Sequence, residues 1–81
     1  MGGGRQFPSL KSQQLLAILK REPLKYEVVR QNGSHRKLES LNGYPPLGFS
    51  YHDGVTVGPG AVKRILVDDV GLGRQEALDL F

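Results

Sequence analysis

Apolar residues recur at helical spacing in a first segment near the start of the chain. Leu15, Ile18 and Leu19 follow one another at intervals of three and one, which places them on one face of a helix. Ser12 stands before this segment, and a serine oxygen there can accept a free backbone N–H of the first turn. The helix is expected to end before Pro23, because the residue before a proline avoids helical geometry. The pattern predicts a helix that begins after Ser12 and ends before Pro23.

A second helical pattern begins at Pro59, because proline suits the first position of a helix. Its apolar stripe consists of Val62, Ile65, Leu66 and Val70. Gly71 is typical of the residue just past a helix end, where positive φ is common. Beyond it, Arg74–Leu80 is long enough for one or two further helical turns.

The segment between these helices is rich in strand-forming residues. Tyr26–Gln31 is predicted as a strand, and Asn32-Gly33 is a strong signal for a hairpin turn. Ser34–Leu41 is then the returning strand. Asn42–Gly48 is predicted as a loop because its two prolines cannot donate hydrogen bonds to a sheet. Phe49–His52 alternates and is predicted as a third strand.

The order helix, three strands, helix predicts an α+β sandwich with a three-stranded antiparallel sheet and two helices on one face. The 81 residues, of 8.9 kDa, suffice for one small domain. Residues 1–10 are Gly-rich and aperiodic at their start, and we expect a flexible leader there. Residues 11–81 are expected to form the single domain.

Composition narrows the classes of protein that this chain can be. It contains no cysteine, which excludes disulfides, thiolate zinc sites and a cysteine nucleophile. No apolar run approaches the roughly 20 residues that span a bilayer, so we expect a soluble, cytoplasmic protein without a membrane partner. Residues 1–41 carry eight Lys or Arg and three Glu. Residues 42–81 carry three Lys or Arg and five Asp or Glu. The basic half suits a polyanionic partner such as nucleic acid.

The predicted hairpin brings one histidine among positive side chains. If Asn32-Gly33 is a two-residue turn, Arg30 lies opposite His35, and Gln31 lies opposite Ser34. Lys37 then shares a face with His35.

The ordered set of motifs resembles the HicA-type (YcfA-like) toxins of bacterial toxin–antitoxin pairs. A Gly-Ser-His follows the first hairpin turn, a second His follows the third strand, and a Pro-Gly begins the last helix. In this chain these motifs are Gly33-Ser34-His35, His52 and Pro59-Gly60, and an Ile65-Leu66 and a Gly71-Leu72 close the domain. The resemblance covers about residues 11–80.

This resemblance implies a fold similar to the double-stranded RNA-binding domain. It also implies cleavage of messenger RNA without a metal or other cofactor, with His35 as the essential catalytic histidine. The implied partners are mRNA and an antitoxin protein of the HicB type.

The chemistry of RNA cleavage fits the predicted surroundings of His35. The RNA 2′-hydroxyl is a built-in nucleophile, so the protein must supply a base, an acid and positive charge. An imidazole can act as either acid or base near neutral pH. The backbone amides of Gly33 and Ser34, at the mouth of the turn, could donate to a phosphate oxygen. The alternative is that His35 is an ordinary polar strand residue.

Other candidate residues have open roles. His52 is a complementary acid, a phosphate ligand or an exposed turn residue. Ser34 could be a nucleophile, but a serine beside a glycine turn usually satisfies local backbone groups. The candidate phosphate contacts are Arg30, Arg36, Lys37, Lys63 and Arg64. For Lys63 and Arg64 the alternative is a solvated helix face, because they lie off the apolar stripe.

No metal site is expected, because His35, His52 and Asp53 are the nearest approach to a ligand cluster and nothing in the sequence brings them together. Two further functions compete with that of a toxin. One is a non-catalytic RNA-binding module of the same architecture, and the other is a protein-interaction domain. The first predicts salt-dependent RNA binding that does not depend on His35.

Overall fold

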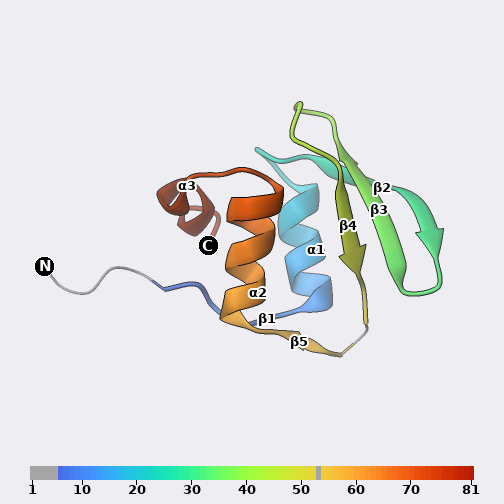
Figure 1. The fold of residues 1–81 in the computed structure, drawn as a ribbon, viewed down its shortest axis with the longest axis horizontal. Coiled ribbons are helices and arrows are strands. Elements are labelled where there is room, and N and C mark those ends of the chain that lie inside the picture. The colour runs from blue at the N-terminus through green and yellow to red at the C-terminus, as the bar shows by residue number, and fades with distance from the viewer. Residues whose placement is uncertain (1–5, 53) are drawn as a thin grey trace, which may run out of the picture.

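The computed structural model describes residues 6–52 and 54–81 of the chain. It is an α+β fold in which helices pack against a three-stranded antiparallel sheet, with a two-stranded sheet beside it (Figure 1). The helical segments are α1 (Ser12–Lys20), α2 (Pro59–Lys63), its continuation η1 (Arg64–Asp69) and α3 (Arg74–Leu78). The strands are β1 (Leu10–Lys11), β2 (Tyr26–Asn32), β3 (His35–Ser40), β4 (Leu47–Ser50) and β5 (Thr56–Val57). The predicted α+β class and the three-stranded antiparallel sheet are confirmed, and the strand order is β2-β3-β4.

The hairpin between β2 and β3 turns one residue later than predicted. Asn32 pairs with His35, so Gly33 and Ser34 form the turn. Gly33 has a φ of 62° and Ser34 keeps a negative φ, which is typical of a type II′ turn with glycine first. The predicted pairing of Arg30 with His35 is therefore wrong, as is that of Gln31 with Ser34. The pairing moves by two residues, and because side chains alternate with a period of two, it changes partners but not faces.

A β-bulge at Val29 decides which side of the sheet Arg30 occupies. The register shifts between Val28 and Arg30, so Val29 has no partner on β3. Val28 pairs with Leu38, which is buried, while Arg30 pairs with Lys37, which is exposed. An extra residue in one strand reverses the alternation beyond it. The bulge thus turns Arg30 away from the helices.

The core lies between one face of the three-stranded sheet and the helices. Leu38 of β3 and Phe49 of β4 face this side and are buried. Both predicted helix stripes are buried there as well: Leu15, Ile18, Leu19, Val62, Ile65, Leu66 and Val70. No helix within the described residues has the length and apolar character needed to cross a membrane.

The first helix begins one residue earlier than predicted. Ser12 is its first residue rather than its cap, and it is buried with its backbone N–H donating to the Val55 carbonyl at 3.1 Å. Lys11 takes the cap position, and its N–H donates to Gln14 Oε1 at 2.8 Å. The helix ends at Lys20, ahead of Pro23 as predicted.

The two-stranded sheet of β1 and β5 is a feature that the sequence pattern does not predict. Leu10 pairs with Val57, and two-residue strands are too short to show alternation. Phe7 is buried and meets Phe81 edge-on, with ring centroids 6.4 Å apart. Folded structure therefore begins ahead of residue 11, within the stretch expected as a flexible leader. Residues 1–5 of that leader lie outside the described residues.

The loop before β4 is tied to the sheet by a buried tyrosine. β4 begins at Leu47 rather than at Phe49, so the loop is shorter than predicted. The Tyr26 hydroxyl donates to the Pro45 carbonyl at 2.6 Å. Burial, and secondarily the nearby Tyr44, raises the pKa of Tyr26 to about 12.

The second helix ends in a wide turn. α2 continues as the π-helix η1, and the Val70 N–H donates to the Ile65 carbonyl at 2.9 Å. Gly71 follows with a φ of 91°, as expected for a glycine at a helix end. α3 fulfils the expectation of a further turn after Gly73.

Candidate nucleic-acid interface

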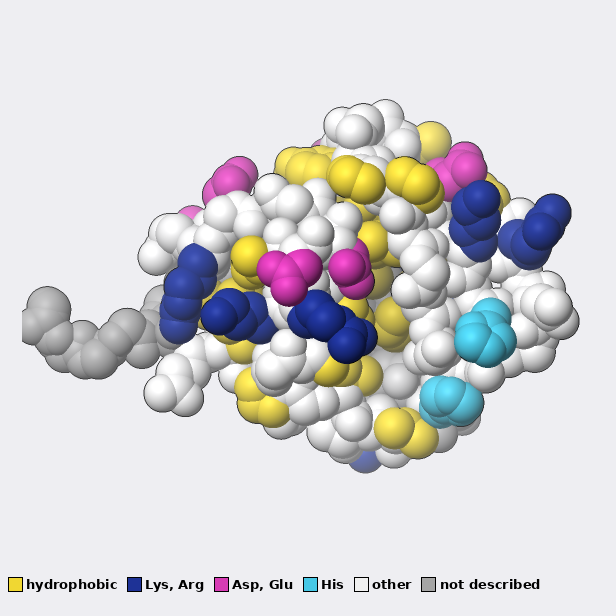
Figure 2. Space-filling view, in the orientation of Figure 1, with side chains coloured by type: hydrophobic (Ala, Val, Ile, Leu, Met, Phe, Trp, Pro, Cys, Tyr) yellow, Lys and Arg dark blue, Asp and Glu magenta, His cyan; other side chains and the backbone are white. Residues whose placement is uncertain are grey.

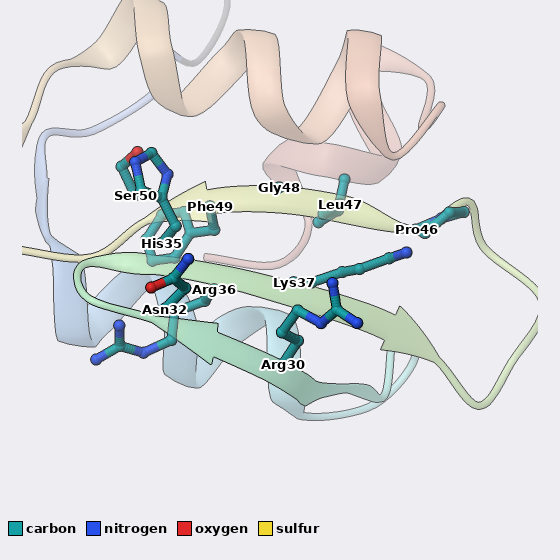
Figure 3. Close-up of a pocket in the computed structure, with 10 residues that line it drawn as sticks. All are labelled: Arg30, Asn32, His35, Arg36, Lys37, Pro46, Leu47, Gly48, Phe49 and Ser50. Carbon is teal, nitrogen blue, oxygen red and sulfur yellow. The ribbon is translucent and has the colours of Figure 1, made fainter.

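The outer face of the three-stranded sheet, on the side away from the helices, carries several predicted site residues. Side chains alternate along β3, so His35 and Lys37 point outward while Leu38 points to the core. Their partners on β2 are Asn32 and Arg30, and cross-strand partners share a face. The four side chains therefore lie together on one surface, and all four are exposed (Figure 3).

This face is hollowed into a cavity of about 650 Å³. The residues that line it are Arg30, Asn32, His35, Arg36, Lys37, Pro46, Leu47, Gly48, Phe49 and Ser50. Its charged lining residues are all cations, with no Asp or Glu among them. Two ladder steps beyond the Arg30–Lys37 pair, past Val28 and Leu38, Glu27 pairs with Glu39. The positive region is therefore confined to the turn half of the sheet, where it would attract an anion.

His35 lies on β3, the central strand of the sheet, and lines this hollow. Its neighbours across the ladder are Asn32 on one side and Ser50 on the other. The imidazole is exposed and forms no hydrogen bond with the residues that the structure describes. Lys37 is two residues along the same strand, so its Cα lies about 7 Å from the Cα of His35 by strand geometry. A solvent-accessible imidazole with cations at this spacing can transfer a proton next to a bound phosphate.

Arg36 differs from the other candidate cations because it faces the helix side of the sheet. Its Nη1 donates to the Gly33 carbonyl at 2.8 Å, and its guanidinium lies over the Tyr51 ring, 5.0 Å from the centroid. These contacts fasten the turn against the end of β4. Although its side chain faces the helix side, Arg36 is among the residues that line the main hollow, and its two contacts hold the hairpin in shape.

Gly33 and Ser34 form the turn at the end of the hollow. The Ser34 carbonyl accepts a hydrogen bond from the Tyr51 N–H at 2.7 Å, which continues the pairing one residue past β4. Ser34 is half-buried and Gly33 is exposed. The two residues therefore set the position of His35, which follows directly.

His52 lies in the segment after β4 and is exposed. Its carbonyl accepts a hydrogen bond from the Val55 N–H at 3.1 Å, so its backbone is held in a turn. Figure 2 shows both histidines of the chain on the same face of the molecule, near its sheet end. Asp53, the third member of the cluster considered as a metal site, lies outside the described residues. Within those residues no group of three or more His, Cys, Asp or Glu side chains could hold a metal ion.

The two candidate cations of the second helix have different surroundings. Arg64 lines a second hollow, of about 210 Å³, between β4 and the helix. Gly48 and Ser50 line both this hollow and the main one. Lys63 is exposed and lines neither of the two. Only Arg64 is therefore brought next to the sheet surface.

Three polar or small residues of the hollow were not among the predicted site residues. The sequence pattern places Asn32 in the turn, Gly48 in the loop and Ser50 only in a strand. Because β4 begins at Leu47, alternation along it puts Gly48 and Ser50 on the same face as His35. Asn32 carried no such signal, because its position depends on where the hairpin turns.

Comparison with known proteins gives no match: no family model fits this sequence, and none of the curated proteins or solved structures searched matches it.

Proposed function

We propose that this protein is an RNA endonuclease of the HicA toxin type, which cleaves mRNA without a metal by acid–base catalysis at His35. One observation carries the proposal. An exposed imidazole lies in a hollow whose charged lining residues are all cations, on the open face of a sheet. Such a surface suits a phosphodiester backbone and supplies the proton-transfer group that RNA cleavage needs.

The proposed reaction uses the RNA's own 2′-hydroxyl as the nucleophile. A base removes its proton, the 2′-oxygen bonds to phosphorus, and the bond from phosphorus to the 5′-oxygen breaks. An acid then protonates the departing 5′-oxygen, leaving a 2′,3′-cyclic phosphate and a 5′-hydroxyl. His35 performs one of the two proton transfers, and water or His52 performs the other.

The cations around His35 have a separate task in this proposal. Negative charge increases on the phosphate oxygens as the new bond forms, and a fixed positive charge stabilises it. Lys37 and Arg30 form a cross-strand pair on the same face as His35. They bind the phosphates on either side of the reacting bond, while the turn amides of Gly33 and Ser34 offer further donors.

The resemblance to HicA-type toxins extends the proposal to fold and partner. The order of helix, three antiparallel strands and helix supports an arrangement similar to the double-stranded RNA-binding domain. An antitoxin of the HicB type would cover the outer face of the sheet, where its acidic groups would meet Arg30 and Lys37. Adding that antitoxin should stop cleavage in proportion to the amount bound.

The experiment that tests the proposal is cleavage of end-labelled single-stranded RNA by the purified chain in excess EDTA. We expect fragments that end in a cyclic phosphate, and no cleavage of DNA of the same sequence, because DNA lacks the 2′-hydroxyl. His35→Ala should lower the rate of cleavage by about 10²–10⁴-fold. Gln31→Ala is the matched control, since Gln31 is an exposed neighbour on β2 that lines no part of the hollow.

Two results would contradict the proposal. One is a folded wild-type protein that cuts no RNA at any concentration. The other is a His35→Ala variant that cuts as fast as the wild type. If the wild type binds RNA but does not cut it, and His35→Ala binds RNA equally well, the non-catalytic binding module is favoured instead.

A further inference from the structure

The hollow between β4 and the second helix continues the main hollow across the edge of the sheet. The two share Gly48, Phe49 and Ser50, so they are separated only by the β4 strand itself. We propose that this second hollow binds a guanine base of the RNA, next to the phosphate on which His35 acts. The inference rests on the proposed function and adds to it the choice of base.

Gly48 leaves the way between the two hollows open. It lies in the ladder opposite Lys37, is exposed, and has no positive φ. A Cβ built at Gly48 would meet no heavy atom within 4 Å. A nucleotide whose phosphate lies at Lys37 can therefore pass its base over Gly48 without meeting a side chain.

The second hollow is lined by two oppositely charged side chains that make no ion pair or side-chain hydrogen bond among the described residues. Arg64 and Asp69 both line it and both are exposed. Among the described residues they form neither an ion pair nor a side-chain hydrogen bond with each other or with a neighbour. Arg64 can only donate and Asp69, when ionised, can only accept. Together they suit a ligand that carries acceptors and donors side by side.

Guanine is the base that satisfies both groups at once. Its O6 and N7 are a pair of acceptors that arginine contacts in a bidentate way. Its N1–H and N2–H₂ are a pair of donors that can contact both oxygens of one carboxylate. Adenine and uracil have neither such pair, and cytosine lacks the pair of donors. Val57 and Ile65 in the same hollow supply apolar contact for the flat face of the ring.

The test is the binding of fluorescent 2′-O-methyl heptanucleotides, in which cleavage is blocked. A uridine heptamer with one central guanosine is compared with the same heptamer carrying adenosine, cytidine or uridine there. We expect the wild-type chain to prefer guanosine roughly tenfold, the effect of a good bidentate contact. Inosine, which lacks the N2 amino group, and 7-deazaguanosine, which lacks N7, should each lose part of that preference.

Variants separate the two contacts. Asp69→Asn should remove the penalty for inosine, and Arg64→Ala the penalty for 7-deazaguanosine. The matched controls are Asp68→Asn, a neighbouring exposed carboxylate outside the hollow, and Lys20→Ala, which removes one positive charge on α1. Both controls should keep the preference for guanosine.

A substitution at the crossing point gives an independent readout. Gly48→Val should lower the preference for guanosine, because its side chain stands between the two hollows. Gly60→Val is the control: it adds the same side chain at a glycine that is equally uncrowded but lies on the helix. It should leave the preference for guanosine unchanged.

Equal binding of all four heptamers by the wild type, or a guanosine preference that survives in both Asp69→Asn and Arg64→Ala, overturns the inference. Cleavage by the wild type that depends on His35 would leave the proposed function standing in that case. Conversely, a guanosine preference without any cleavage would overturn the proposed reaction alone.

Discussion

The two faces of the three-stranded sheet are made by the same strands but differ in what their side chains do. On the inner face Leu38, Leu47 and Phe49 are at most 5% exposed. On the outer face of the same strands, His35, Lys37 and Gly48 are exposed. Burial makes the inner face the main source of stability, while the outer face is free to hold groups that a packed core would not tolerate.

The comparison teaches that stability and chemistry can be separated residue by residue along one strand. His35, Lys37 and Leu38 lie within four positions of β3, yet only Leu38 is packed. Substitutions on the outer face should therefore change activity and leave folding intact. Substitutions on the inner face should do the reverse.

The largest expected effect is on activity, from the outer face. His35→Ala should lower the rate of RNA cleavage by about 10²–10⁴-fold, the usual contribution of a positioned acid or base. Its free energy of unfolding should change by less than about 0.5 kcal/mol, because the ring is exposed and unpacked. Single-turnover cleavage and urea unfolding of the same preparation check both parts. A large loss of stability would mean that the two faces are not separate.

The next effect is on stability, from the inner face. Leu38→Ala should lower the free energy of unfolding by about 2–5 kcal/mol, since it leaves a cavity at a fully buried site. Lys37→Ala, one residue away, is the control and should alter stability by less than about 0.5 kcal/mol. Chemical denaturation of the two variants measures the difference. Similar losses in both would contradict the division between the faces.

A smaller effect is expected on RNA binding from the outer face. Arg30→Ala should weaken binding several-fold and reduce the slope of log affinity against log salt by about 1, because one phosphate contact is lost. A titration of labelled RNA at several salt concentrations gives the slope. The same slope in wild type and variant would show that Arg30, although turned outward by the bulge, does not contact the backbone.

The smallest effect concerns the tyrosine that joins the inner face to the loop. Tyr26→Phe removes the hydrogen bond to the Pro45 carbonyl and should cost about 1 kcal/mol at neutral pH. The pKa of Tyr26 is about 12 in the folded protein, against an ordinary value of 10.0. The unfolded chain therefore loses this proton first, and the stabilisation falls as pH rises from about 10 through about 12. Relative to Tyr26→Phe, the wild type should lose its advantage across that range, as urea unfolding at each pH would measure.

Much of the fold follows from local patterns. The helix stripes, the proline at the start of the second helix and the glycine after its end were all sufficient to place those elements, because helix contacts are close in sequence. The shared face of His35 and Lys37 followed from strand alternation alone. The two-stranded sheet was not predictable, since Leu10 and Val57 are far apart in sequence and each strand has only two residues.

The sequence by itself determined the alternation that places His35 and Lys37 on one face and Leu38 on the other. Only the tertiary structure decided which residues stand beside them. The hairpin turns at Gly33-Ser34, and the bulge at Val29 turns Arg30 outward. The position of the turn and the bulge both depend on how β2 packs against the rest of the protein while β3 stays paired with β4. That packing is a sum of contacts between distant segments, whereas alternation is a property of every extended chain.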